Sequence, residues 1–286
     1  MNQFKSFKYR FYNFNIAEKL IVINVVLFVL PFFFRTLFFL FNLPTDSILN
    51  WFELSPKIEL TLFRPWTLFT YAFIHGSLSH ILWNMLLLYY SSQFFLNLFS
   101  ADRFINVYFL GVLAGGLVFL VSYWLFPVFK GVYPSLVGSS AGVMAILIFI
   151  CTYTPMQEIR LLFFNIKLMY FGIAMVVIDI LQIPTSNAGG HIAHLGGALI
   201  GYIYASQLIK GNDIGFKFEK VWKSVFNFFK PKSEMKTVYK ARKKSSAKNN
   251  QTEQQKIDSI LDKISASGYE SLTKEEKDIL FKAGKK

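Results

Sequence analysis

The sequence has few charged residues and a single cysteine. Charged side chains make up 16% of its 286 residues, whereas hydrophobic residues make up 53% and aromatic residues 18%. Because soluble domains usually carry about 25% charged residues, this composition excludes an ordinary soluble domain and indicates an integral membrane protein. The one cysteine, Cys151, lies in an apolar run, so no disulfide can form within the chain and cysteine usage indicates no redox compartment.

Acidic residues are scarcer than basic ones, and the excess of positive charge is uneven. The formal net charge is +13, and residues 211–286 supply +8 of it, with 18 Lys and Arg against 10 Asp and Glu. A basic tail can bind nucleic acid, but beside membrane segments it more commonly contacts anionic lipids on the cytoplasmic side. We therefore expect membrane lipids, and no nucleic acid, among the partners.

Long apolar runs are abundant. Six of them are near the ~20 residues that a membrane-spanning helix requires, and they lie at about 20–41, 78–98, 104–126, 135–154, 161–181 and 189–209. This pattern predicts an all-α polytopic membrane protein with six transmembrane helices. An even number of spans leaves both basic ends on one side, which predicts cytoplasmic N- and C-termini. We expect the protein in a bacterial inner (plasma) membrane.

The charge and hydropathy patterns divide the chain into five parts. Residues 1–19 are a cytoplasmic N-terminus, and 20–210 are the six-helix membrane domain. Residues 211–230 form a basic amphipathic helix at the membrane interface, because apolar side chains recur there at helical spacing. Residues 231–252 have little to bury and are expected to be a flexible linker. Residues 253–286 form a small helical hairpin, in which Gly268 ends one helix and Thr273 with Glu276 caps the next.

Two hydroxyls stand in a run of small residues at 137–145, at the start of the fourth apolar segment. In this run Gly138 and Gly142 are four apart, as are Ala141 and Ala145. Small residues at this spacing allow close helix packing, and the sixth segment carries Gly197 and Gly201 at the same spacing. Packing these two segments together would bring Ser140 near His194. The predicted topology also places His80 and Asn84 at a similar depth, and polar groups inside a bilayer normally face the bundle interior.

These four residues can be assigned roles in peptide hydrolysis. Ser140 is the candidate nucleophile, and His194 the candidate base that takes its proton. His80 and Asn84 lie one helical turn apart and could donate hydrogen bonds to the oxyanion. Asp179 is a possible residue to orient the histidine, but it belongs to a different segment and is expected to lie too deep, so the sequence predicts a Ser/His dyad.

Three further side chains have alternative readings. Ser139 precedes the candidate nucleophile but points about 100° away on a helix, and we expect it to have a packing or water-binding role. His191 and His194 have metal-ligand spacing, but with no acid or thiolate expected nearby we predict no metal and no cofactor. His75 is expected to make a hydrogen bond rather than to catalyse.

The sequence resembles the rhomboid family of intramembrane serine proteases. The resemblance covers about residues 15–210 and rests on three motifs in order: His80 to Asn84 (the HxxxN helix), Gly138-Ser139-Ser140 (the GxS of GxSG), and Ala193-His194 with Gly197 (the AHxxG helix). It implies a rhomboid-like six-helix bundle with a small cytoplasmic helical extension. The family's second motif glycine is Ala141 here, and Met144 replaces the aromatic residue that usually supports the histidine.

The resemblance implies a serine endopeptidase that cleaves the transmembrane segments of membrane proteins. It gives Ser140 and His194 the catalytic roles, and His80 and Asn84 the oxyanion roles. The alternative is a catalytically inactive rhomboid-like protein that binds membrane clients, for which loss of a dyad residue would be expected. A transporter or channel would need charged residues along the whole bundle rather than at one depth.

Overall fold

The structure is a computed structural model that describes residues 11–42, 49–161, 164–229 and 245–284. The chain divides into two compact units, residues 1–229 and 230–286. The first unit contains the α-helices α2 (Ile16–Leu40), α3 (Ile58–Phe63), α4 (Thr67–Thr70), α5 (Leu78–Leu98), α6 (Ala101–Leu125), α7 (Ser140–Tyr153), α8 (Leu168–Gln182), α9 (Ala188–Ile209) and α10 (Phe216–Phe229). The second unit contains α11 (Ser245–Ser267) and α12 (Lys274–Ala283).

Each predicted apolar segment contains one main helix, but these helices differ in length. Among the described residues, α2, α6 and α9 are long and apolar enough to cross a membrane, whereas α7 and α8 are apolar but shorter. By length and composition, three helices therefore qualify rather than the six that were predicted. Of the predicted N-terminal part, residues 1–10 lie outside the described residues, and α2 already begins at Ile16 behind an Asn15 capping box.

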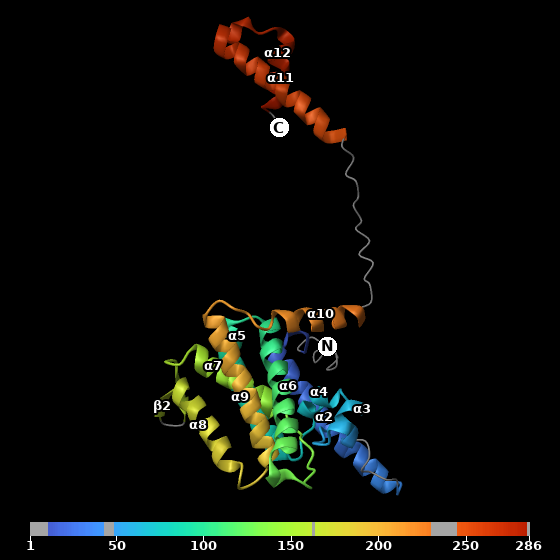
Figure 1. Ribbon diagram of the computed structural model, residues 1–286. Coiled ribbons are helices and arrows are strands. Elements are labelled where there is room, and N and C mark those ends of the chain that lie inside the picture. The colour runs from blue at the N-terminus through green and yellow to red at the C-terminus, as the bar shows by residue number, and fades with distance from the viewer. Residues whose placement is uncertain (1–10, 43–48, 162–163, 230–244, 285–286) are drawn as a thin grey trace. The chain divides into compact units, whose positions relative to one another are not determined.

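The short helix α7 is the centre of the first unit. All residues from Ala141 to Cys151 are buried, and α7 packs against α5, α6, α8 and α9 (Figure 1). A helix that is apolar on every side is expected to be buried all round. Residues 135–139, predicted as its first turn, are not helical: Leu136 pairs with Leu54 in an isolated β-bridge. Consequently α7 begins at Ser140, with its first turn inside the bundle.

Helices α6, α7 and α9 meet through residues without bulky side chains. A Cβ added to Gly197 would overlap the carbonyl oxygen of Ala141, and one added to Gly201 would overlap that of Ala145. The predicted contact between α7 and α9 is therefore present along this alanine stripe. The extra methyl of Ala141 faces Gly115 of α6, where a second Cβ would lie only 2.5 Å from it. A glycine on α6 thus makes room for this departure from the family motif.

The predicted glycine stripe of the fourth segment does not face α9. Gly142 lies against the Tyr108 ring of α6, at 2.7 Å from an added Cβ. Gly138 precedes the helix and has a φ of +115°, in the region that favours glycine. The stripe is split because the backbone leaves the helix at residue 139, so the four-residue spacing no longer places both glycines on one face.

The fifth apolar segment starts with a β-hairpin rather than a helix. Strands β1 (Glu158–Leu161) and β2 (Phe164–Lys167) are antiparallel, with Glu158 opposite Lys167 and Leu161 opposite Phe164. Polar and apolar residues alternate in both strands, and this period of two is typical of a strand. The prediction of a span from 161 is therefore wrong at its start, because α8 begins at Leu168.

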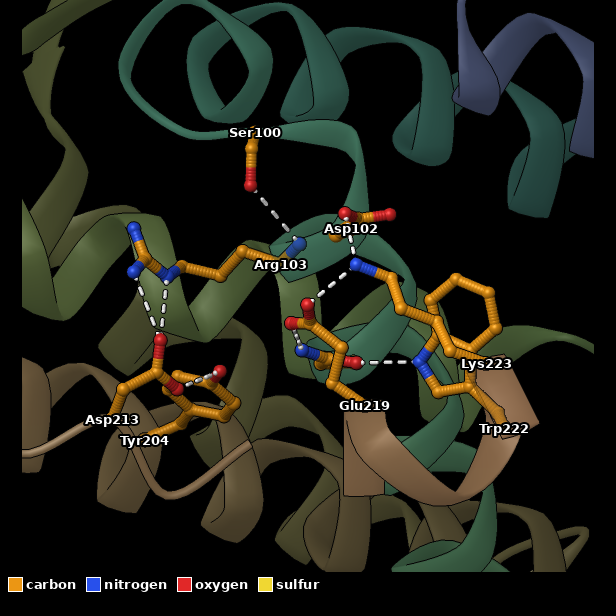
Figure 2. A network of polar contacts seen from close by, with 9 residues as sticks. Ser100, Asp102, Arg103, Tyr204, Asp213, Glu219, Trp222 and Lys223 are labelled. Atoms are coloured by element: carbon orange, nitrogen blue, oxygen red, sulfur yellow. Dashed lines mark hydrogen bonds and ion pairs between the residues drawn. The ribbon is translucent and has the colours of Figure 1, made fainter. Parts of the chain in front are cut away.

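Helix α10 runs across one end of the bundle (Figure 1), and polar contacts hold both the helix and the turn that precedes it. Figure 2 shows Arg103 of α6 donating from Nε and Nη2 to Asp213 Oδ2, over 3.2 and 2.9 Å, while Tyr204 of α9 donates to Oδ1 over 2.5 Å. Lys223 of α10 contacts Asp102 of α6. Partial burial acts to raise the pKa of Asp213, but the hydrogen bonds from Tyr204 and Arg103 prevail and lower that pKa below its ordinary value.

The second unit is a helical hairpin with the predicted caps. Helix α11 ends at Ser267, and Gly268 follows with a φ of +76°. At the start of α12, Glu276 N donates to Thr273 Oγ1 over 3.3 Å, and Thr273 N donates to a Glu276 carboxylate oxygen over 2.8 Å. Helix α11 begins at Ser245, within the part predicted as linker, because its Ala, Lys, Gln and Glu residues favour helix. Residues 231–244 of that predicted linker lie outside the described residues.

Candidate active site

A cavity of about 260 Å³ lies between the N-terminal halves of α5, α7 and α9. Its lining includes all four predicted site residues: His80 and Asn84 from α5, Ser140 from α7, and His194 from α9. Met144 and Met175 also line it, the latter from α8. Since one water occupies about 30 Å³ of liquid volume, the cavity has room for several waters.

The turn before α7 positions Ser140 at the first residue of the helix. Gly138 N donates to the carbonyl of Tyr71 over 2.9 Å. A Cβ on Gly138 would lie 2.6 Å from two atoms of the His80 ring, so only glycine lets that ring approach the turn. The N–H groups of a first helical turn have no acceptor within the helix. The backbone N–H of Ser140 is such a donor, at the positive end of α7.

The two adjacent serines have different environments. Ser139 is completely buried, and its Oγ lies 3.2 Å from His75 Nε2, which also accepts from the backbone N–H of Ser139 over 3.4 Å. His75 therefore makes the kind of hydrogen bond that was expected of it. Ser140 is partly exposed and faces the cavity. Because only an accessible hydroxyl can reach a substrate, the cavity geometry favours Ser140 over Ser139 as the reactive serine.

His194 has a carboxylate partner that was not expected from the sequence. Its Nδ1 lies 2.8 Å from Oδ1 of Asp179 on α8, and His191 Nδ1 lies 2.7 Å from the same oxygen. The expectation that Asp179 is too deep was wrong, because α8 begins at Leu168 and its last turns reach the start of α9. An acid within an apolar segment was the signal that could have identified it.

The pair on α5 has the predicted spacing but is partly engaged within its own helix. Asn84 Nδ2 donates to the carbonyl of His80 over 2.9 Å, which leaves the second amide N–H of Asn84 for the cavity. Ser140 and His194 line the same cavity, and no hydrogen bond joins them in the part of the chain that the structure describes. Catalytic hydrogen bonds of unliganded enzymes are often long and shorten when substrate binds.

A larger cavity of about 580 Å³ lies between α7, α8 and α9. Apolar side chains line most of it, including Ile148, Ile173, Val176 and Leu199, and neither a histidine nor a carboxylate is among its lining residues. Cys151 and Tyr202 also line it, but without a histidine or carboxylate it has no general base to activate a nucleophile. The smaller cavity is therefore the candidate active site.

Two family models match the chain. Residues 63–211, just over half of the chain, match the rhomboid domain. The chain belongs to the rhomboid family. Residues 243–286 match a family of unknown function, DUF6576. The rhomboid domain contains every residue that lines the candidate active site.

Curated relatives of this rhomboid carry related names. The chain is 27% identical over 195 residues to the bovine (Bos taurus) presenilin-associated rhomboid-like protein, mitochondrial, which covers 67% of this chain and 48% of the relative. It is 28% identical to the human (Homo sapiens) protein of that name, over 62% of this chain and 44% of the relative. It is 30% identical to RHOMBOID-like protein 12, mitochondrial, of Arabidopsis thaliana, over 51% of this chain and 47% of the relative. This rhomboid thus matches slightly less than half of each relative's length.

The predicted cellular location is contradicted by these relatives. A bacterial inner membrane with both termini in the cytoplasm was expected, whereas the relatives are mitochondrial proteins. The placement of Lys and Arg reports the side of a membrane on which a loop lies. It does not distinguish one membrane from another, so charge alone could not identify the compartment.

Proposed function

We propose that this rhomboid is a serine endopeptidase that cleaves transmembrane segments of other membrane proteins. Ser140 is the nucleophile and His194 the general base, with His80 and Asn84 as hydrogen-bond donors. The observation that carries this proposal is that all four side chains line one cavity. For four polar side chains from three helices, helix adhesion alone would not require a shared cavity.

The reaction follows from these roles. Ser140 Oγ attacks the carbonyl carbon of the scissile peptide bond while its proton passes to His194 Nε2. When the C–N bond breaks, His194 gives this proton to the departing amine, and an acyl-enzyme remains. A water molecule in the cavity then attacks the ester carbonyl and gives its proton to His194. The bond from the carbonyl carbon to Ser140 Oγ breaks, His194 returns the proton to Oγ, and the new C-terminal carboxyl group leaves. Neither a metal nor an organic cofactor takes part in these steps.

The negative charge that forms on the carbonyl oxygen needs donors. The Ser140 backbone N–H, at the start of α7, is one, and His80 and Asn84 supply the others from α5. Removing one such donor typically lowers the rate ~10²–10³-fold. His80→Ala or Asn84→Ala should therefore reduce the cleavage rate by this factor. Full activity in either variant would show that the substituted residue is not an oxyanion donor.

Membrane-embedded substrates suit the surface of the first unit. Large apolar side chains are exposed on its outer helices, among them Phe39 at 78%, Phe63 at 80% and Trp124 at 72%. Lipid contact explains such exposure in a membrane protein. We propose that α2 and α5 to α9 all cross the bilayer.

An intact substrate helix hides its carbonyls in hydrogen bonds. We therefore expect the enzyme to prefer transmembrane substrates that contain helix-destabilising residues near the cleavage point.

The decisive test is covalent labelling of the purified protein with a fluorophosphonate probe, together with cleavage of a model transmembrane substrate. Ser140→Ala should lose both activities, as should His194→Ala. Ser139→Ala is the matched control: it removes the neighbouring hydroxyl, which bonds to His75, and should still be labelled. Labelling that persists in Ser140→Ala but not in Ser139→Ala would refute the assignment. A folded wild-type protein with neither activity would instead identify a catalytically inactive, client-binding rhomboid.

A further inference from the structure

Two histidines of α9 converge on one carboxylate oxygen of α8. His191 and His194 each place Nδ1 within 2.8 Å of Asp179 Oδ1. Asp179 is 5% exposed, and its second oxygen, Oδ2, is buried without a hydrogen-bond partner. A carboxylate inside an apolar segment is costly and usually has a function. The arrangement raises the question of what Asp179 does for His194.

We propose that Asp179 is a positioning residue that completes a Ser140–His194–Asp179 triad, an inference that rests on the proposed function. A carboxylate oxygen at hydrogen-bond distance can only accept, so Nδ1 of His194 must carry the proton. The Nε2 lone pair is then left free at the cavity, where the proton of Ser140 has to be taken. The carboxylate also stabilises the imidazolium that forms after that transfer, without itself being protonated.

His191 fixes the carboxylate from the other side. It is one helical turn before His194, so both rings lie on the face of α9 that meets α8. Its side chain is 12% exposed, against 21% for His194, and it lies outside the cavity lining. With two donors on Oδ1, the rotation of the Asp179 side chain is restricted. His191 therefore acts on Asp179 rather than on the substrate.

The same three side chains could be read as a metal site, since two histidines and an aspartate are common ligands. The distances argue against this reading. Ligand atoms each about 2.0–2.1 Å from a tetrahedral zinc ion lie roughly 3.3 Å apart. The two N–O separations are 2.7 and 2.8 Å, which fits direct hydrogen bonds between ring nitrogen and carboxylate.

The test compares two substitutions that both remove the hydrogen bond between Asp179 of α8 and His191 of α9. Asp179→Leu removes the acceptor of both histidines, and His191→Phe removes one donor while the bond between Asp179 and His194 remains. Asp179→Leu should lower kcat and the rate of probe labelling ~10²–10⁴-fold with little change in KM. His191→Phe should lower them less than about tenfold. Asp179→Asn keeps an oxygen acceptor but not the charge, and should fall between wild type and Asp179→Leu.

A second readout does not depend on activity. The chain has four histidines, so ¹⁵N-histidine NMR of the full-length protein in detergent can assign each ring by substitution. We expect His194 protonated at Nδ1 with a bare Nε2, and a shift toward the other tautomer in Asp179→Leu. A merely structural contact would change the melting temperature but would not separate kcat from KM or change this tautomer.

The outcomes separate the two proposals. Wild-type protein without labelling at Ser140 overturns the proposed function and the triad with it. Normal labelling of Ser140 in Asp179→Leu, or equal losses in Asp179→Leu and His191→Phe, overturns only the role of Asp179. Activity that chelation abolishes and Zn²⁺ restores would also overturn it, in favour of a metal site.

Discussion

The contact between α7 and α9 can be tested by adding one methyl group, in Gly197→Ala. The new Cβ would overlap the carbonyl oxygen of Ala141, which is backbone and cannot rotate away. That Cβ would lie 2.0 Å from the oxygen, so the two helices would have to separate by roughly 1.5 Å before these atoms reach the van der Waals distance of about 3.5 Å. His194 is one helical turn before Gly197, so this separation moves the base away from Ser140.

The expected effect on activity is larger than that on stability. Overpacking a dense interior costs about 1–3 kcal/mol, but replacing glycine with alanine inside a helix recovers about 1 kcal/mol. The free energy of unfolding should therefore fall by roughly 0–2 kcal/mol. Misplacing a catalytic group by about 1 Å can lower the rate ~10²-fold. Gly197→Ala should thus remain folded but lose most of its activity.

Two measurements on the purified variant test this expectation: the melting temperature in detergent, and the rate of fluorophosphonate labelling. Gly76→Ala is the matched control, because its Cβ would meet no atom within 4 Å. Wild-type labelling by a folded Gly197→Ala protein would refute the argument that close contact of these helices positions the base. An equal loss of labelling in both variants would also refute it.

Three further results are expected. Gly138→Ala should cost about 1–3 kcal/mol and abolish labelling, because its φ of +115° and the His80 ring both exclude a Cβ; thermal melting and labelling would check this, and a stable, active variant would contradict it. Asp213→Asn should lower the melting temperature at neutral pH. Because the pKa of Asp213 is lowered in the folded state, its ionised carboxylate stabilises the fold at any pH above its ordinary pKa of about 3.9. The difference in melting temperature between wild type and Asp213→Asn should vanish as the pH falls through the lowered pKa. A difference that does not change with pH would contradict this role of Asp213. Thr273→Ala should destabilise α12 by about 1 kcal/mol, seen as faster amide exchange confined to that helix in the full-length chain, and unchanged exchange would show that the cap contributes nothing.

Much of the architecture follows from the order of residues. Composition identified a membrane protein, and the apolar runs located the long helices. Three short motifs were enough for the family resemblance and for the residues that line the cavity. The capping box at Thr273 was equally readable, because a cap is formed by residues three apart. Each of these signals lies within a short stretch of sequence, and the family resemblance needs only the order of three such stretches.

Other features depended on distant parts of the chain. The bridge between Leu54 and Leu136 delays the start of α7 and thereby places Ser140 in its first turn. No pattern near residue 140 specifies this pairing. At the start of the fifth segment, polar and apolar residues alternate as in a strand, but the segment as a whole is apolar enough to predict a membrane span. A β-hairpin forms there instead.

The sequence by itself determined the membrane class, the approximate positions of the long helices and the serine and histidine motifs, because hydropathy and motif spacing can be read along the chain without knowing which distant residues are in contact. Only the tertiary structure decided which serine faces the cavity and which carboxylate holds the histidine. Ser139 and Ser140 are neighbours in sequence, yet one is sealed against His75 and the other is accessible. Asp179 meets His194 because α8 packs on α9, and such a packing arrangement between helices is encoded in no local pattern.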